Sequence, residues 1–150
     1  MVGRRLAMIS YSERIGNFFN RLSKDTMNLV TEFYSEDAEF LDPLVALKGS
    51  KEIKKYYSGL YQSVQEIHFE FSDIIEAGHT VAAPWVMHLK TSKLNSGKAF
   101  SVPGISNIKF NPQSRQAIYH RDYFDMGAFI YEHVPVLGAS IRFVKRRLHA

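Results

Sequence analysis

The chain has 150 residues, 45% of them hydrophobic and 23% charged, which suits one folded domain with a sizeable core. It contains no cysteine, and this excludes disulfides, thiolate metal sites and cysteine nucleophiles. The formal net charge of +4 comes from the two ends, since six of the 19 basic residues fall in the first ten or last nine positions. The other 13 basic residues stand against 15 acidic ones, so the body of the chain offers no basic face to nucleic acid.

The two ends are expected to be appendages of one domain. Residues 1–10 are predicted to form a flexible extension, residues 11–133 the domain, and residues 134–150 a basic helical tail. The apolar stretch after Arg4-Arg5 is too short for a secretory signal, and no apolar run approaches the roughly 18 residues that span a membrane. With the lack of cysteine, this predicts a cytoplasmic protein with no membrane or nucleic-acid partner.

Helical periodicity governs the first third of the chain. Apolar residues spaced i, i+3, i+4 and i+7 predict a first amphipathic helix. These residues are Ile15, Phe18, Phe19 and Leu22. Ser23 is a candidate N-cap for a second helix. The apolar side of the second helix contains Met27, Val30 and Phe33 or Tyr34.

A short extended segment and a third helix follow. The segment starts at Asp37 and ends at Pro43, because the residue before a proline is disfavoured in a helix. Gly49-Ser50 is expected to begin the third helix. Its apolar side contains Ile53, Tyr56 or Tyr57, Leu60, Tyr61 and Val64.

After Gln65 the hydrophobic period changes to two, which predicts four strands. They cover residues 67–71, 81–91, 99–110 and 117–126. Short turns at residues 95–97 and 111–114 have hairpin spacing, so the sheet is expected to be antiparallel. Pro103-Gly104 inside a strand is interpreted as a bulge that bends the sheet.

This order of elements predicts an α+β fold. Three N-terminal helices pack on one face of a strongly curved antiparallel sheet, and a short helix ends the chain. A bent sheet cannot pack flush against three helices, so an apolar pocket is expected at its open end. The other face of the sheet also needs a cover, and a homodimer formed through that face supplies one.

Asp42 is the first candidate for chemistry. It follows Phe40-Leu41 and precedes Pro43-Leu44, so apolar residues flank the carboxylate on both sides. In an apolar pocket a carboxylate becomes a usable general base near neutral pH. The alternative is an Asx-type turn before the proline.

The last strand supplies the second candidate, a histidine beside a carboxylate. Alternation places Ile118, His120, Asp122 and Phe124 on one face, and Tyr119, Arg121, Tyr123 and Asp125 on the other. His120, oriented by Asp122, is therefore a candidate general acid or base. The alternative is a structural pair, in which His120 and Asp122 only satisfy each other's hydrogen-bonding groups within the core. The second face suits a polar surface or a dimer contact, with Arg121 paired to Asp125.

Trp85 and Met87 share one face of the second long strand, as the wall of an apolar ligand site or as ordinary core. The histidines show no paired i, i+2 or i, i+4 spacing, which argues against a metal site. No glycine-rich phosphate loop and no Gly-x-Ser-x-Gly elbow occurs. The sequence therefore predicts no metal and no cofactor.

Two segments, residues 37–53 and 119–125, resemble the nuclear transport factor 2-like superfamily in its SnoaL-like branch. The resemblance runs from about Ile15 to about Met126. It implies a cone-shaped fold, which hosts isomerases, hydrolases, cyclases, dehydratases and non-catalytic binders.

In relatives similar to ketosteroid isomerase, a carboxylate before proline shuttles the proton, and Asp42 matches it. The positions of that family's oxyanion hole hold Phe18 and Ser106 here.

The last strand resembles limonene-epoxide hydrolase, whose catalytic acid or base matches Asp122. The arginine and second aspartate of that catalytic set fall at Trp85 and Met87.

The leading hypothesis is a SnoaL-like pocket protein that binds a small lipophilic molecule or transforms it by isomerase-type or hydrolase-type acid/base chemistry. The candidate catalytic residues are Asp42, His120 and Asp122. The candidate ligand-binding residues are Phe18, Trp85, Met87, Ser106 and Phe124. The alternative is a module without catalysis that binds a ligand in the pocket or a protein on the sheet face.

Overall fold

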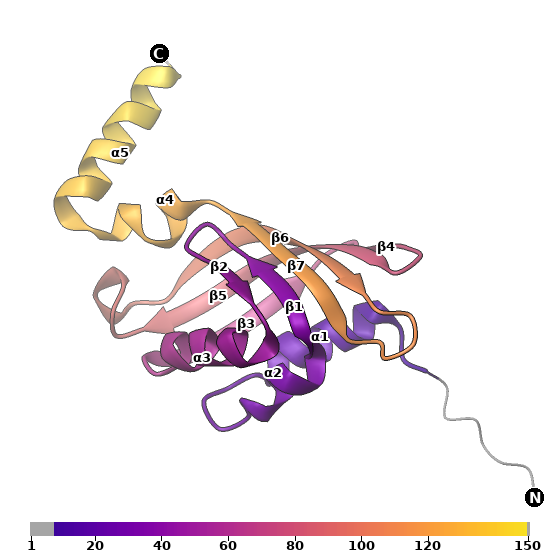
Figure 1. Ribbon diagram of the computed structural model, residues 1–150. Coiled ribbons are helices and arrows are strands. Elements are labelled where there is room, and N and C mark those ends of the chain that lie inside the picture. Colours follow the sequence, from indigo (N-terminus) through magenta and orange to yellow (C-terminus); the bar gives the residue numbers. More distant parts are fainter. Residues whose placement is uncertain (1–7, 150) are drawn as a thin grey trace, which may run out of the picture.

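The computed structural model describes residues 8–149, so most of the predicted N-terminal extension lies outside the described residues. The elements follow in Figure 1 as α1 (Tyr11–Arg21), α2 (Asn28–Phe33), β1 (Tyr34–Leu41), β2 (Ala46–Lys48), α3 (Ser50–Tyr61), β3 (Val64–Phe71), β4 (Ile75–Ala77), β5 (Thr80–Thr91), η1 (Asn95–Gly97), β6 (Phe100–Phe110), β7 (Ala117–Phe124), α4 (Met126–Phe129), η2 (Tyr131–His133) and α5 (Pro135–Leu148). The predicted α+β class is confirmed.

Helix α1 forms where its periodicity predicts. The Ser10 hydroxyl accepts a hydrogen bond from the Glu13 backbone N–H at 3.1 Å, and the Glu13 carboxylate accepts the Ser10 N–H at 3.0 Å. This capping box satisfies two amides that the helix cannot bond itself. Ile15, Phe18 and Phe19 are buried on one face, which fixes how α1 docks.

Helix α2 is shorter than predicted, because Ser23 closes a turn and does not cap the helix. The Thr26 hydroxyl accepts the Ser23 backbone N–H at 2.8 Å, and the two hydroxyls lie 3.0 Å apart. The helix therefore begins only at Asn28 and ends at Phe33. Tyr34 is already extended and opens β1.

The sheet is mixed, and the prediction of a purely antiparallel sheet is wrong. Its strand order is β2-β1-β7-β6-β5-β3, with β4 on β5. Strand β1 runs parallel to β7, and the other pairs are antiparallel. Hairpin turns fix direction only between consecutive strands, whereas the chain passes through α3 and strands β3 to β6 before β7 reaches β1.

The predicted bulge at Pro103-Gly104 is also absent, and the sheet is not strongly curved (Figure 1). Gly104 pairs with Trp85 and Pro103 with Val86 in an unbroken register. Gly104 has a packing role instead, since a Cβ at this position would overlap the Trp85 ring. The glycine therefore lets the indole lie flat across β6.

The alternation predicted along β7 is wrong at its start. The pairing with β6 skips one residue between Ala117 and Tyr119. The skipped Ile118 is a bulge residue and is 39% exposed, whereas Ala117 is buried. Beyond the bulge the predicted alternation holds, and His120 is buried on the helical side.

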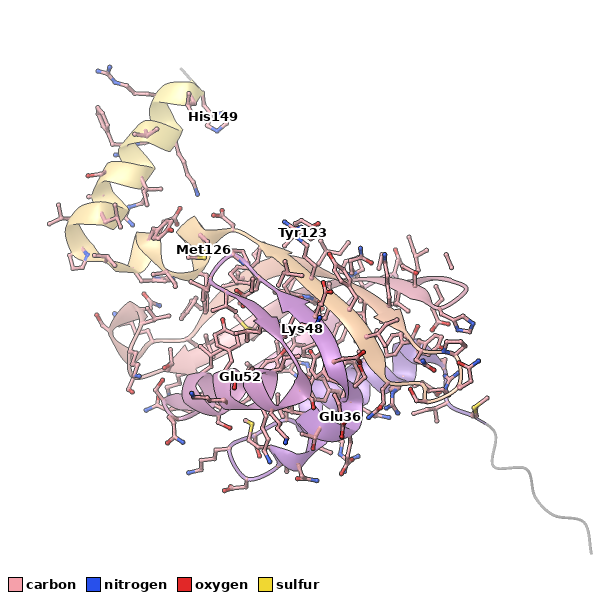
Figure 2. All side chains as sticks on the ribbon, in the orientation of Figure 1. Glu36, Lys48, Glu52, Tyr123, Met126 and His149 are labelled. Carbon is pink, nitrogen blue, oxygen red and sulfur yellow. The ribbon has the colours of Figure 1, made fainter. Side chains whose placement is uncertain are left out.

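The helices α1, α2 and α3 gather on one face of the sheet, and the buried cluster fills the space between these layers (Figure 1). On the opposite face Ile105 and Tyr123 are exposed, and Tyr123 points away from the helices (Figure 2). The Arg121 guanidinium lies over the Tyr123 ring, 4.9 Å from its centroid, and makes no pair with Asp125. This face therefore offers rings and cations to solvent.

Asp125 caps α4 in place of its predicted pairing with Arg121. Its carboxylate accepts the backbone N–H of Gly127 at 2.7 Å and of Ala128 at 3.3 Å. Two contacts of Lys145 tie α5 to this corner, at 2.5 Å to Glu132 and 3.5 Å to Asp125. The C-terminal helix α5 has 14 residues, within the range predicted for the basic helical tail, and leads away from the sheet (Figure 1).

Candidate functional site

A cavity of about 300 Å³ opens between α3, the helical side of the sheet and α4. Its walls are mostly rings and aliphatic side chains. They are Phe19, Phe40, Asp42, Leu44, Tyr56, Tyr57, Gly59, Leu60, Tyr61, Ser63, Val64, Ile67, Phe69, Trp85, Met87, Leu89, Thr91, Lys93, Leu94, Asp122, Phe124, Phe129 and Ile130. This volume and composition suit a small lipophilic ligand.

Strand β7 brings Asp122 to the cavity wall and His120 directly behind it. His120 is fully buried, and its Nε2 lies 2.6 Å from Oδ1 of Asp122. The Asp122 side chain is 13% exposed and lines the cavity, whereas His120 is absent from the lining. Of the predicted pair, only the carboxylate reaches the cavity.

A second group holds the same oxygen of Asp122. The Ser106 hydroxyl donates to Oδ1 at 2.5 Å, and it accepts the indole N–H of Trp85 at 2.9 Å. Ser106 is fully buried and pairs with Asp122 across β6 and β7. The register of the hairpin therefore places a donor behind the carboxylate.

Two tyrosines complete the network on the other side of the imidazole. The Tyr34 hydroxyl lies 2.6 Å from Nδ1 of His120, and the Tyr57 hydroxyl lies 3.3 Å from that of Tyr34. We assign the neutral Nε2–H tautomer to His120, because Nδ1 then accepts from Tyr34 while Nε2–H donates to Asp122. Every hydrogen bond in the network then points toward Asp122.

Burial keeps the tyrosines in their protonated, donating form. It raises the pKa of Tyr34 and of Tyr57 well above the ordinary value, and the negative charge of Asp122 adds to the shift in both. Sequence reasoning missed both residues, because Tyr34 lies 86 positions before His120 and Tyr57 reads as core.

Asp42 forms the Asx-type turn that was the alternative interpretation, and it also lines the cavity. Its Oδ1 accepts the backbone N–H groups of Leu44 at 2.7 Å and Val45 at 2.8 Å, which is an Asx-type turn. Its Oδ2 accepts from the Tyr56 hydroxyl at 2.7 Å, and the residue lines the cavity. Burial, this hydrogen bond and the charges of Asp42 and Asp122 all raise the pKa of Tyr56. Both carboxylates therefore act on one region of the cavity.

Tyr61 is a further cavity residue that sequence reasoning assigned to the apolar side of α3. It is 5% exposed, and no group of residues 8–149 hydrogen-bonds its hydroxyl. Burial raises its pKa, so the hydroxyl remains a donor. The i, i+4 spacing of Tyr57 and Tyr61 was the available signal, since it puts both rings on one helix face.

The five predicted ligand-binding residues divide into two groups. Trp85, Met87 and Phe124 line the cavity. Phe18 and Ser106 do not: the Phe18 ring stacks on Phe33 with centroids 4.1 Å apart inside the core, and Ser106 lies behind Asp122. A Phe18 ring so enclosed supports the wall and does not form it.

Within the described residues no group of three or more His, Cys, Asp or Glu side chains is placed to hold a metal ion. No helix among these residues is long and apolar enough to cross a membrane.

The family of the chain follows from its sequence and its fold together. The family model of the SnoaL-like domain matches residues 15–114. The chain belongs to the SnoaL-like domain family. The match ends before β7, so Asp122 and His120 are placed by the structure alone.

Solved structures share the nuclear transport factor 2-like fold at low sequence identity. A protein of Shewanella denitrificans named as a SnoaL-like polyketide cyclase is 19% identical over 79% of this chain and 92% of its own, with a TM-score of 0.68. A protein of Catenulispora acidiphila with a ketosteroid isomerase-like fold, in complex with trimethylamine, is 12% identical over 82% and 89%, with a TM-score of 0.67.

A third structure is TerC co-crystallised with polyporic acid, 14% identical over 79% of this chain and 93% of its own, with a TM-score of 0.65. No curated protein matches the chain in sequence. These likenesses show the fold of the chain.

Proposed function

We propose that this SnoaL-like protein binds a small lipophilic molecule in the cavity and transforms it by acid/base chemistry at Asp122. The observation that carries the proposal is the asymmetry of this carboxylate. Its Oδ1 receives hydrogen bonds from His120 and Ser106, whereas no group of the described residues bonds Oδ2. A carboxylate held in one orientation on the wall of an apolar cavity is equipped to exchange a proton with a bound ligand.

The reaction best suited to this arrangement is proton transfer at a carbon next to a carbonyl. Oδ2 of Asp122 takes the proton, the electron pair of the broken C–H bond forms a C=C bond, and the π pair of the carbonyl moves to its oxygen. The Tyr61 hydroxyl is available to donate a hydrogen bond to that oxygen. Return of the proton to a conjugated carbon completes isomerisation. Hydrogen exchange at the same carbon is complete when the Asp122 carboxyl group first exchanges its proton with solvent water and then returns one to the carbon.

The other candidate residues have supporting roles in this proposal. His120 does not touch the ligand and acts as a positioning residue through Asp122, together with Ser106. Asp42 is the second carboxylate at the cavity and holds Tyr56 in place. Trp85, Met87 and Phe124 exclude water, which strengthens the electrostatic interactions inside.

Deuterium exchange into 2-tetralone, an enolisable ketone small enough for the cavity, tests the proposal. NMR in D₂O would follow loss of the α-proton signals with the native protein, with Asp122→Asn and with Asp25→Asn. The last variant makes the same chemical change at an exposed loop residue. We expect Asp122→Asn to lower the protein-dependent exchange rate at least about 100-fold relative to the native protein. Asp25→Asn should leave this rate unchanged. Equal rates with and without protein would refute catalysis of this class.

A module that binds without catalysis is the second candidate. The observation in its favour is Asp42, whose two oxygens already serve an Asx-type turn and the Tyr56 hydroxyl. A ketone that stabilises the protein in a thermal-shift assay, yet keeps its α-protons, would establish this alternative.

We also propose that two copies of the chain form a homodimer through the exposed face of the sheet. Ile105, Ile118 and Tyr123 are exposed there, and a second copy would cover them. A monomeric mass by light scattering at high protein concentration would contradict this. A cytoplasmic location fits the cysteine-free sequence, and fractionation of cells that express the chain would check it.

A further inference from the structure

We propose that the cavity selects lipophilic amines, small apolar molecules with one protonated nitrogen, over neutral and anionic molecules of the same shape. This inference rests on the ligand-binding part of the proposed function, because it names the class of molecule that the cavity binds. An ammonium group bonded to Oδ2 of Asp122 occupies the oxygen that takes the proton, so the amine is a ligand and an inhibitor of the proton transfer, not its substrate. Three features of the cavity carry it: its charge, its rings and the unused oxygen of Asp122.

The acidic side chains that line the cavity are more buried than its basic side chain. Asp122 and Asp42 are half-buried or more, and their charges reach the same tyrosine, Tyr56. Among the described residues that line the cavity, Lys93 is the single cation, and it is exposed on the segment after β5. A ligand anion deep in the cavity would meet two carboxylates in a medium that screens them poorly, whereas a cation would complement them.

Aromatic rings line the same cavity as the Asp122 carboxylate. Trp85 and Phe124 lie with ring centroids 6.3 Å apart, and both line the cavity with Asp122. Phe40 also lines it and packs edge-on to His120 at 4.9 Å. The faces of such rings attract cations, most strongly where water is excluded, and carry no attraction for anions.

The hydrogen-bond inventory points the same way. Oδ2 of Asp122 is an acceptor, and no group of the described residues bonds it. The buried Tyr61 hydroxyl lines the same cavity and has a lone pair to offer. An ammonium group brings the donors that these two acceptors need, and its bond to a carboxylate is charge-assisted.

Three ligands of one shape and different charge test the inference. They are 2-naphthylmethylamine, 2-naphthalenemethanol and 2-naphthoic acid, which at pH 7 are a cation, a neutral molecule and an anion. Dissociation constants measured by calorimetry on the full chain, in about 0.5 M NaCl, would suppress contacts with exposed acidic residues while leaving the cavity unscreened. We expect the amine to bind about tenfold more tightly than the alcohol, and the acid to bind most weakly.

The substitution Asp122→Asn identifies the responsible group. It should bring the amine-to-alcohol affinity ratio close to one, whereas Asp25→Asn, at an exposed loop position, should leave the ratio unchanged. Far-UV circular dichroism of each variant checks the fold. Because the readout is a ratio, a general loss of affinity in the variant does not produce the expected result.

Each other outcome overturns the inference, and the alcohol shows whether the proposed function falls with it. Equal binding of alcohol and amine, or tightest binding of the acid, would refute amine selection while leaving a ligand-binding cavity intact. A tenfold preference that survives Asp122→Asn would also refute it, since the selecting group would lie elsewhere. Failure of all three ligands to bind would overturn the cavity proposal as well.

Discussion

The substitution Tyr34→Phe removes one oxygen atom from the fully buried network and leaves the ring in place. His120 then loses the 2.6 Å donor to Nδ1, and Tyr57 loses its 3.3 Å partner. A buried acceptor without a donor costs about 1–3 kcal/mol, and the longer bond contributes about 0.5–1 kcal/mol. We therefore expect the free energy of unfolding to fall by about 2–4 kcal/mol. In urea denaturation this lowers the midpoint by roughly 1–2 M with an unchanged slope.

Two further variants make the test specific to the network. Tyr123→Phe removes a hydroxyl from a ring that is 50% exposed, so its effect should stay within about 0.5 kcal/mol. Tyr57→Phe should cost about 1 kcal/mol, and the double variant with Tyr34→Phe should cost less than the two single changes added together, because the two hydroxyls share one hydrogen bond. A cost below about 0.5 kcal/mol for Tyr34→Phe would refute the assignment of His120 as an acceptor from Tyr34.

Gly104→Ala should destabilise the protein by about 2–4 kcal/mol in urea denaturation, because its Cβ would overlap the Trp85 ring. Asp125→Ala removes two hydrogen bonds at the start of α4 and should cost about 1 kcal/mol in the same assay. Alkaline pH should destabilise the fold. Burial raises the pKa of Tyr34 and Tyr57 above the ordinary 10.0, so the unfolded chain releases its phenolic protons first and the free energy of unfolding falls as pH rises above 10.0.

Both substitutions have a matched comparison variant. Gly16→Ala adds the same methyl group to α1 where nothing lies within 4 Å, and it should stabilise the protein by up to about 1 kcal/mol. Equal effects of the two glycine substitutions would contradict the packing role of Gly104. Asp25→Ala, at an exposed loop position, is the comparison for Asp125→Ala. A free energy of unfolding that stays constant from pH 9 to pH 12 would contradict the raised pKa of the buried tyrosines.

Local sequence patterns predicted the elements well where the decisive interactions are local. The i, i+3 and i+4 spacing of Ile15, Phe18 and Phe19 predicted the buried face of α1, and the hairpins between β5, β6 and β7 follow from short turns. The wall positions of Trp85 and Phe124 follow from alternation within a strand. The neighbouring positions of His120 and Asp122 on one face were predictable for the same reason.

Two of the wrong predictions depended on how strands pair. The direction of β1 beside β7 and the bulge that exposes Ile118 are properties of strand pairing. Neither feature can be predicted from the spacing of apolar residues. A hydrophobic period indicates which residues of a strand are buried, but it does not indicate which neighbouring strand they pair with.

The sequence by itself determined the α+β class, the helices, the long strands and the presence of carboxylates among apolar residues. Only the tertiary structure decided which carboxylate is held at the cavity wall by buried hydrogen-bonding groups. Tyr34, Ser106 and His120 come from β1, β6 and β7, and they meet around Asp122 only when the sheet is assembled. The physical reason is range: helix caps and alternation act over a few residues, whereas a buried polar network is specified by the packing that encloses it.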